Sequence, residues 1–454
     1  MSAEDTELAG WGRTARKRSR VLRPASTDAL AELVRNEPAV TVRGAGKSYG
    51  DAALPGAGVV LDMTGRNQIL SFDRNTGLVI AEGGVLLKEI IERTLRLGWL
   101  LPVIPGTERI TIGGAIASDV HGKNHPGAGS FGHHVLWLDL LRSDGTVTRL
   151  SANQDPDGFW ATIGGMGLTG VTVRAAIQLQ RVETGWAIQN RRRTRSLEGT
   201  LEALRTLSGW QEIDPDRHVI AWLDGRAAKG ALGRGIIDEF RPASSRDLPG
   251  SVAPYPERRM RAGAPRSSLP GPGVVSRRTI GAASTARWWL SRPANARLVP
   301  LATALCPLDG VESWPAAFGR GGLVQYQLAV PPDREAAIQD VLHFLAARRL
   351  TPALVTLKSF GFGNAGPLSF PVPGWTLALD LPARWLGDPK LLRPIDALVA
   401  DAGGRVYLAK DAVVDPALIP QMYPRLATWR ETRARLDPVG RWTSALAERL
   451  DLVP

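Results

Sequence analysis

Short runs of β-branched residues alternate with glycine-rich turns along the first 180 or so residues of this chain. The runs begin with AVTVR at residue 39 and continue through GVVLDM, LVIAEGG, VLWLDLLRSDGTVTRL and GVTVRAAIQLQ. Residues 86–99 instead carry apolar side chains at nearly helical spacing, and Gly98 is placed to end that helix. A strict alternation of strands and helices is missing, so we expect an α+β domain of mixed sheets rather than a doubly wound fold.

The pattern changes after about residue 185. Residues 189–207 predict the beginning of a helix, and residues 225–300, rich in Gly, Pro, Ser and Arg, predict an extended and partly mobile loop. Ordered segments then follow as a strand, an amphipathic helix and two further strands: GLVQYQLAVP, REAAIQDVLHFLAARRL, PALVTLKSFG and WTLALDLP. They predict a second α+β domain built on an antiparallel sheet. The tail that follows contains a strand-like segment, RVYLAK, and then helices.

Length and charge limit the classes of protein. The 454 residues suggest two or three domains, and a formal net charge of +12 fits nucleic acid, an anionic membrane surface or a phosphorylated substrate. The single cysteine, Cys306, excludes an intramolecular disulfide and a cysteine-based zinc site. The charged N-terminus lacks the apolar core of a signal peptide, and no run of about 18 apolar residues follows. We therefore expect no transmembrane helix and a location on the cytoplasmic side.

The stretch AVTVRGAGKSYGD, residues 39–51, contains a Gly-Lys-Ser sequence like that of phosphate-binding ATPase loops. The ATPase motif requires a glycine five residues before Gly46, where this chain has Thr41, so the spacing excludes it. Glycines 44, 46 and 50 can expose successive backbone N–H groups as an anion-binding nest, or form a tight surface turn. Both alternatives remain open from this stretch alone.

Residues 102–134 combine seven glycines with four of the six histidines, His121, His125, His133 and His134. A metal site is not predicted, because only Asp119 accompanies the histidines and the intervening Gly and Pro prevent a helical His-x3-His face. A flavin cradle needs glycines where rings and phosphates touch the backbone, and small residues such as Ala117 and Ser118. A structural crossing between strands is the remaining alternative.

RGAGKSYGD, PGTERITIGGAIASDVHGKNH, GSFG and FWATIGGMGLTGVTV resemble the FAD-binding domain of the vanillyl-alcohol-oxidase-type flavoproteins. More narrowly, GWGRT, HGKNH, QYQ, LSFPVPGW and AKD…MYPR resemble the decaprenylphosphoryl-β-D-ribose 2′-oxidase family of actinobacterial cell-wall synthesis. The similarity runs from Gly10 to the C-terminus and is weakest over residues 225–300.

The resemblance implies a two-domain α+β fold in which FAD-binding segments 1–185 and 405–454 enclose a substrate domain, residues 186–404 with its antiparallel sheet. Members with a covalently held flavin commonly carry His where this chain has Lys47, so the resemblance implies non-covalent FAD. The implied cofactor-binding residues are Gly44, Ala45, Gly46, Lys47, Ser48, Tyr49, Gly50, Pro105, Gly106, Thr107, Ile110, Gly113, Gly114, Ala117, Ser118, His121, Gly122, Val173 (near the adenine) and Tyr407.

The resemblance also assigns the reacting groups. Lys410, Tyr49 and His121 are the implied catalytic residues, although without the resemblance Lys410 is better explained as a solvated lysine at a strand end. The predicted substrate-binding residues are Gln325, Gln327, Lys358, Tyr407 and Trp222. The resemblance places Lys358 near the substrate phosphate, whereas a position in the core is the commoner role for a residue such as Trp222. Gln325 and Gln327 face the same side of their strand because side chains alternate with a period of two.

One position departs from the family pattern. Close relatives often carry Cys where this chain has Ala378, so thiol-directed covalent inhibitors that act at that Cys are expected to fail here.

The implied activity is FAD-dependent oxidation of the ribose 2′-hydroxyl of decaprenylphosphoryl-β-D-ribose, the first half of an epimerisation that a partner keto-reductase completes for arabinan synthesis. The implied contacts are the lipid-linked phosphosugar and an anionic membrane surface, with the periplasmic face as the alternative location. An alditol or sugar-lactone oxidase on the same flavin fold is the alternative activity. A nucleic-acid-binding protein is not expected, since no helix-turn-helix, zinc-finger or RNA-binding aromatic motif accompanies the arginines.

Overall fold

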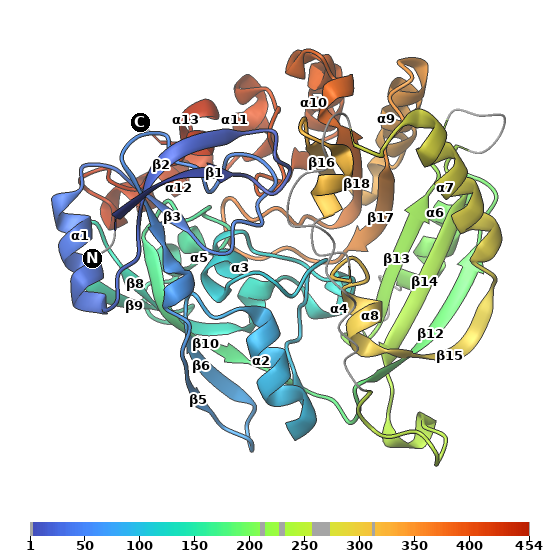
Figure 1. Ribbon diagram of the computed structural model, residues 1–454, viewed down its shortest axis with the longest axis horizontal. Coiled ribbons are helices and arrows are strands. Elements are labelled where there is room, and N and C mark those ends of the chain that lie inside the picture. Colours follow the sequence, from blue (N-terminus) through green and yellow to red (C-terminus); the bar gives the residue numbers. More distant parts are fainter. Residues whose placement is uncertain (1–2, 209–213, 227–231, 257–272, 311–313, 454) are drawn as a thin grey trace.

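The computed structural model describes residues 3–208, 214–226, 232–256, 273–310 and 314–453 (Figure 1). The chain forms two parts that lie side by side, and the C-terminal helices cross back from the second part to the first (Figure 1). No helix among the described residues combines the length and the apolar character needed to cross a membrane.

The first part holds two larger sheets and a short strand pair. The four-stranded sheet has the order β1 (Ala3–Ala9), β2 (Arg16–Leu22), β4 (Val59–Asp62), β3 (Val40–Arg43). The five-stranded sheet has the order β5 (Ile69–Phe72), β6 (Leu78–Glu82), β10 (Val171–Gln178), β8 (Val135–Leu141), β9 (Val147–Leu150). The pair is β7 (Trp99–Leu100) and β11 (Gln180–Arg181), and the helices are α1 (Thr27–Asn36), α2 (Leu87–Thr94), α3 (Ile112–Ala117), α4 (His125–Ala128) and α5 (Pro156–Thr162).

The second part is built on one antiparallel sheet of eight strands. Their order is β15 (Ala294–Pro300), β12 (Trp186–Arg193), β14 (Gly235–Pro242), β13 (His218–Leu223), β17 (Leu354–Phe360), β18 (Gly374–Pro382), β16 (Leu323–Val330), β19 (Arg405–Val406). The helices of this part are α6 (Leu197–Ser208), α7 (Arg277–Leu290), α8 (Leu301–Leu305), α9 (Ala336–Ala347) and α10 (Arg393–Asp401).

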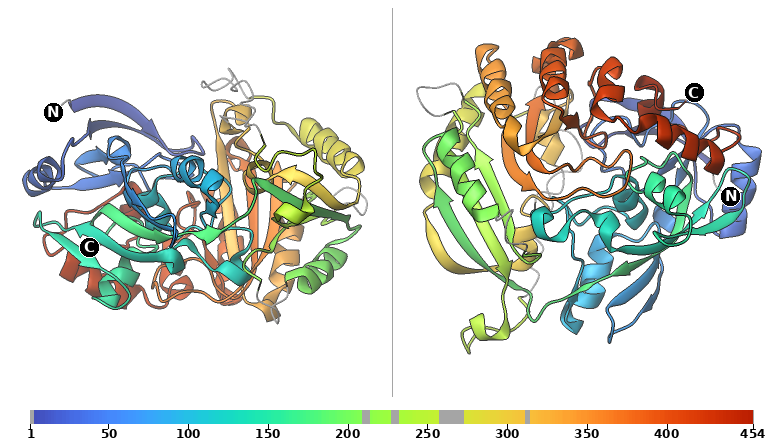
Figure 2. Two further views of the ribbon diagram at one scale, coloured as in Figure 1. Left: turned by 90° about the horizontal axis from the view of Figure 1, so that it is seen from below. Right: turned by 180° about the vertical axis from the view of Figure 1, so that it is seen from behind.

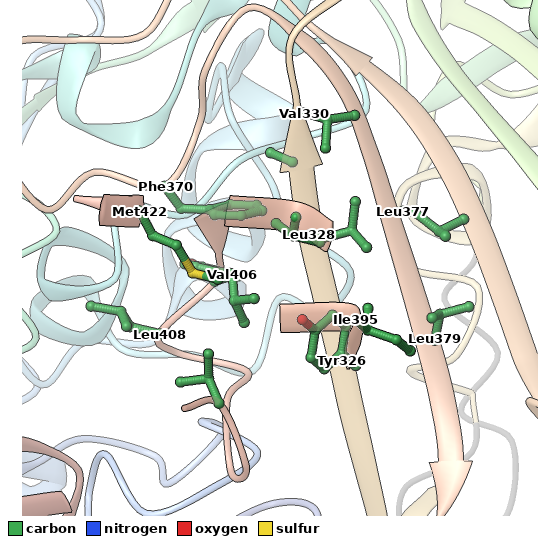
Figure 3. Close-up of a cluster of buried hydrophobic side chains, with 14 of the residues drawn as sticks. Tyr326, Leu328, Val330, Phe370, Leu377, Leu379, Ile395, Val406, Leu408 and Met422 are labelled. Carbon is green, nitrogen blue, oxygen red and sulfur yellow. The ribbon is translucent and has the colours of Figure 1, made fainter. Parts of the chain in front are cut away.

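Side chains of the eight-stranded sheet alternate between an apolar face and a polar one. On β16, Tyr326 and Leu328 pack into the largest hydrophobic cluster together with Ile395 of α10 (Figure 3). Helices α6, α9 and α10 cover that face, as the view from behind shows (Figure 2). Because successive strand residues point to opposite faces, Gln325 and Gln327 are turned away from the helices, into the space between the two parts.

The residues after β19 return to the first part. They form α11 (Ile419–Met422), α12 (Leu426–Leu436) and α13 (Ala445–Arg449), and α12 packs against α5. Arg449 donates hydrogen bonds to the carboxylates of both Asp51 and Asp411 at 2.8–2.9 Å. The expected boundary at residue 185 lies at the passage into β12, whereas β19 is still paired with β16 just beyond the expected boundary at residue 404.

Two predictions about the middle of the chain are wrong. Residues 225–300 are not one loop, because they contain β14, α7 and β15, although residues 227–231 and 257–272 lie outside the described residues. The arginine run at residues 191–193 ends strand β12, and the helix begins only at Leu197. Arg191 forms a bidentate pair with Asp238 on the neighbouring strand at 2.6 and 2.8 Å. Such cross-strand pairs place charged residues inside a sheet and hide the apolar alternation that marks a strand.

We expect the buried carboxyl of Asp396 to make stability depend on pH. Burial raises its pKa to about 7, although Tyr326 Oη and the Asp415 N–H donate to it. An unfolded Asp titrates near 4, so this group adds stability below about pH 4 that is lost as the pH rises through about 7. The loss amounts to roughly 2–3 kcal/mol between pH 5 and 7.5. Chemical unfolding of wild type and Asp396→Asn at both pH values tests this. If the free energy of unfolding falls equally in the two proteins between these pH values, the expectation is wrong.

Candidate active site

A cavity of about 670 Å³ separates the glycine-rich turns of the first part from the polar face of the eight-stranded sheet. Its walls include almost all residues predicted to bind the cofactor: Gly44, Ala45, Gly46, Lys47, Ser48, Tyr49, Pro105, Gly106, Thr107, Ile110, Gly113, Gly114, Ala117, Ser118, His121, Gly122 and Tyr407. The sheet and the segment after it contribute Trp222, Gln325, Gln327, Lys358, Ala378 and Lys410. The fold therefore brings the predicted cofactor and substrate residues to one cavity.

Two predicted cofactor residues do not line this cavity. A Cβ atom on Gly50 would lie 1.9 Å from the carbonyl oxygen of Asp411, so this glycine permits close contact with the C-terminal segment. Val173 is buried in a hydrophobic cluster with Leu141 and Trp442. Val171 and Thr172 line the cavity instead of Val173.

The turn after β3 lies against the cavity and is held from both ends of the chain. Trp11 N–H donates to Ser48 O at 2.7 Å, and Tyr49 N–H donates to Ala409 O at 3.1 Å. Gly46 has φ +62°, a left-handed conformation that glycine adopts without strain. Within the described residues, the N–H groups of Ala45, Gly46 and Ser48 donate to no backbone carbonyl. These open N–H groups make the turn a candidate anion-binding nest for a pyrophosphate.

The second glycine-rich segment meets this turn at the beginning of α3. A Cβ on Gly44 would lie 2.1 Å from Oγ1 of Thr111, the N-cap of α3, so the backbone of the turn touches the helix end. Gly113 N–H donates to Gly83 O at 2.7 Å, which brings a third glycine segment to the same wall. The candidate nest, a glycine-rich wall and a cavity of about 670 Å³ fit the pyrophosphate and ring system of FAD.

His121 is buried and neutral in the cavity wall. Burial, followed by the charges of Lys358, His125 and Lys410, holds its pKa well below the usual range. The Gln327 amide lies 3.0 Å from His121 Nε2 and donates to Thr376 Oγ1 at 3.2 Å. With Nε2 as acceptor, the proton of the ring is on Nδ1, which is buried and has no hydrogen-bond partner among the described residues.

The other histidines of residues 102–134 are directed to separate partners. His125 Nδ1 accepts from Gly361 N–H at 3.1 Å, His133 Nδ1 lies 3.2 Å from Ser130 N, and His134 Nε2 lies 2.8 Å from Ala128 O. Over the described part of the chain, no group of three or more His, Cys, Asp or Glu side chains is placed to hold a metal ion.

Two desolvated lysines stand on the sheet side of the cavity. Burial lowers the pKa of Lys410 to about 8 even though the charge of Asp380 opposes the shift, and Lys410 Nζ lies 4.1 Å from the ring centre of Tyr49. Burial, together with the charges of Lys123 and Lys410, lowers the pKa of Lys358 to about 7. Lys358 Nζ donates to Gly122 O at 3.3 Å. Both amines can thus exchange a proton near neutral pH.

Tyr407 connects the returning C-terminal segment to the loop that carries His121. Its hydroxyl donates to Ser118 O at 2.7 Å, and its ring stacks on Phe370 at 4.5 Å. The loop itself is fixed by buried Asp119, which accepts from Ser369, Asn364 and the N–H of Gly132. These contacts make the cavity wall rigid where the two parts meet.

Asp380 is a buried residue of the site that sequence reasoning missed. It accepts from Gln325 Nε2 at 2.5 Å and from Trp314 Nε1 at 3.1 Å. The sequence WTLALDLP could have indicated this residue. Side chains alternate along a strand, so Asp380 lies on the same face as Ala378. Trp11, whose ring centre lies 3.3 Å from Lys47 Nζ, was missed as well, although it stands in the GWGRT motif that carries the resemblance.

We expect this protein to resist thiol reagents under native conditions. Ala378 offers no thiol to the cavity, and Cys306 is 5% exposed with a thiol pKa raised by burial. Intact-mass spectra after maleimide treatment should show no adduct on wild type and one adduct on Ala378→Cys. Cys306→Ala in the Ala378→Cys background is the control and should keep that adduct. A full adduct on native wild type would contradict the expectation.

Comparison with known proteins agrees with this geometry. Residues 19–151 match the family described as FAD binding domain. A decaprenylphosphoryl-β-D-ribose oxidase of Mycolicibacterium smegmatis is 35% identical over 463 residues, which cover 98% of this chain and 97% of the relative. An uncharacterised protein of Streptomyces coelicolor is 39% identical over 385 residues, 81% of this chain and all of the relative (100%). An L-gulono-1,4-lactone dehydrogenase of Mycobacterium tuberculosis is 30% identical over 194 residues, 41% of this chain and 42% of the relative.

These matches confirm the predicted α+β flavoprotein fold and FAD as the cofactor. The roles assigned to individual side chains stay predictions, which the variants below test. The match over nearly its whole length shows that the chain belongs to the decaprenylphosphoryl-β-D-ribose oxidase family of FAD-dependent oxidoreductases acting on CH–OH groups.

Proposed function

We propose that this protein oxidises the ribose 2′-hydroxyl of decaprenylphosphoryl-β-D-ribose to the 2-keto sugar. The observation that carries the proposal is the cavity, in which Gln325, Gln327, Lys358 and Lys410 face the glycine turns. The full-length similarity to an oxidase named for this substrate supports the same choice.

In this proposal the residues of the chain position the sugar and move its hydroxyl proton. Bound FAD supplies the acceptor for the hydride that leaves the alcohol carbon. Lys410, with its pKa near 8, takes the hydroxyl proton at Nζ, and Tyr49 packs beside it. Lys358 contacts the phosphate as a point charge, because a nearby anion favours its protonated form. Gln327 holds the neutral His121 against the sugar.

The chemistry of the product implies a partner. A keto sugar is half of an epimerisation, so we propose that a keto-reductase consumes it and yields the arabinose epimer for cell-wall arabinan. A polyprenyl chain resides in a bilayer, and we therefore propose a peripheral location at an anionic membrane, on the cytoplasmic or the periplasmic side.

The alternative activity is oxidation of a free alditol or sugar lactone. The partial match to a lactone dehydrogenase prompts it, but that match covers 41% of this chain. It predicts turnover of soluble polyols or lactones without a lipid phosphate.

Substrate turnover by purified flavoprotein tests the proposal. Dye reduction should require a polyprenylphosphoryl-ribose and should be absent with free ribose, xylitol or gulonolactone. Turnover of the free polyol alone would falsify it. Acid precipitation should release the flavin into the supernatant, because Lys47 stands where a covalent histidine link would form; flavin retained in the pellet would exclude non-covalent binding.

A further inference from the structure

Helix α7 presents an apolar face that no described element covers. Its outward residues are mostly small at the centre and large at the C-terminal end: Ala282, Ala283, Ala286, Trp289 and Leu290, all exposed. Trp289 is 63% exposed and Leu290 79%, which are among the largest values for apolar side chains in the described chain. Figures 1 and 2 place α7 at the periphery of the second part.

The opposite side of α7 fastens the helix to the sheet. Ile280 and Ser284 are buried, and the Trp288 indole N–H donates to Thr194 O at 3.4 Å. The guanidinium groups of Arg193 and Arg234 both contact the Trp288 ring, at 4.7 and 4.9 Å from its centre. Because Trp288 points toward the sheet and fixes the helix there, the next residue, Trp289, points outward.

Arginines lie at both ends of this helix. Arg277 and Arg278 lie at the beginning of α7, and Arg287, Arg292 and Arg297 lie near its end. In the part of the chain that the structure describes, none of these five forms an ion pair with a carboxylate. An apolar centre containing Trp within an arginine rim is the pattern of helices that lie in an anionic membrane interface.

Helix α7 also reaches the cavity. Arg287 and Arg297 line the cavity, and Arg287 lies over the ring of Trp222 at 5.2 Å. Leu308, 37% exposed, lines it as well. A bilayer seated on α7 would therefore meet the substrate side of the cavity.

We propose that the outer face of α7 is the membrane-docking surface of this protein and binds anionic phospholipid bilayers through Trp289, Leu290 and the arginine rim. The benefit of such docking rests on the proposed function, because a lipid-linked sugar has to enter the cavity from the bilayer. A second copy of this chain fits the face less well, since two arginine rims would face each other across a twofold axis.

Cosedimentation of the purified flavoprotein with vesicles tests the surface. Vesicles of phosphatidylcholine with 30% phosphatidylglycerol should bind wild type at least about tenfold better than phosphatidylcholine alone, and salt should weaken the binding. Trp289→Ser with Leu290→Ser should lower binding to the anionic vesicles about tenfold. Leu70→Ser with Val439→Ser removes two other exposed apolar side chains, from the first part and the C-terminal segment, and should leave binding unchanged.

Each outcome bears on the surface separately from the activity. Equal binding to both vesicle types, or unchanged binding of the Trp289/Leu290 variant with native flavin content and melting temperature, overturns the proposal. A concentration-dependent dimer that this variant abolishes, without vesicle binding by wild type, overturns it in favour of self-association. Turnover of detergent-dispersed substrate should be the same in wild type and the variant. Failure of turnover in both, with vesicle binding intact, contradicts the proposed function and leaves the docking surface standing.

Discussion

Replacing Lys410 by Met is expected to lower kcat/KM for the lipid-linked sugar by about 10²- to 10⁴-fold, the usual contribution of a positioned proton acceptor. The flavin should stay bound, because the nest and the glycine wall lie on the other side of the cavity. The absorbance ratio of flavin to protein, measured on the same sample, separates lost chemistry from lost cofactor.

The pH profile gives this prediction its sharpest form. In the proposed function the proton acceptor is neutral Lys410, whose pKa is about 8 because the cavity desolvates the amine. The neutral fraction grows as the pH rises, so kcat/KM should increase up to about pH 8 and then level off, as long as the substrate contact of Lys358 persists. Lys410→Arg is the matched control, since it keeps a cation that does not deprotonate and should lose the rising limb.

Loss of Lys358 should look different. Lys358→Met removes the proposed phosphate contact, so KM should rise more than kcat falls, in contrast to the effect at position 410. For Lys410, two results would show that another group accepts the hydroxyl proton. They are an increase of kcat/KM with pH that survives in Lys410→Arg, or an unchanged kcat in Lys410→Met.

Replacing Gly106 by Leu is expected to reduce bound FAD about tenfold or more while the fold stays intact. Gly106 lines the cavity, and a Cβ at this position meets no protein atom within 4 Å. A larger side chain thus fills free space beside the glycine wall and competes with the cofactor, without displacing protein atoms. The flavin content after purification and a fluorescence titration with added FAD measure the effect.

A matched control separates this steric effect from a general loss of stability. Gly250 also has no atom within 4 Å of an added Cβ, and it does not line the cavity. Gly250→Leu should retain FAD. After removal of the flavin from all three proteins, both variants should unfold near the same temperature as wild type. Full flavin content in Gly106→Leu would show that FAD does not bind next to Gly106.

Much of the fold was predictable from local patterns. The strand runs before residue 180 form β3, β4, β6, β8, β9 and β10, and Gly98 ends the α2 region with φ +83°. The later runs form β16, α9, β17 and β18. These segments follow from side-chain periodicity and glycine placement, which operate over a few neighbouring residues.

The segments that sequence reasoning missed depend on distant partners. β14 carries Asp238 and Glu239 and is a strand because β12 and β13 pair with it on both sides. Val173 has the β-branched character of its neighbours, but its packing against Trp442 of the C-terminal segment excludes it from the cavity wall. Gly50 is required by the carbonyl of Asp411, far away in the sequence.

The sequence by itself determined the glycine spacing that excludes an ATPase loop, the common face of Gln325 and Gln327, and the family motifs that name FAD. Only the tertiary structure decided that the turn at Gly46 and the segment at Lys410, which follows β19, close around one cavity. The reason is physical. Periodicity and φ preferences depend on neighbouring residues in the sequence, whereas the desolvation of a side chain depends on distant residues that the fold packs around it. The lowered pKa of Lys410 exists only because residues from both ends of the chain bury the same amine.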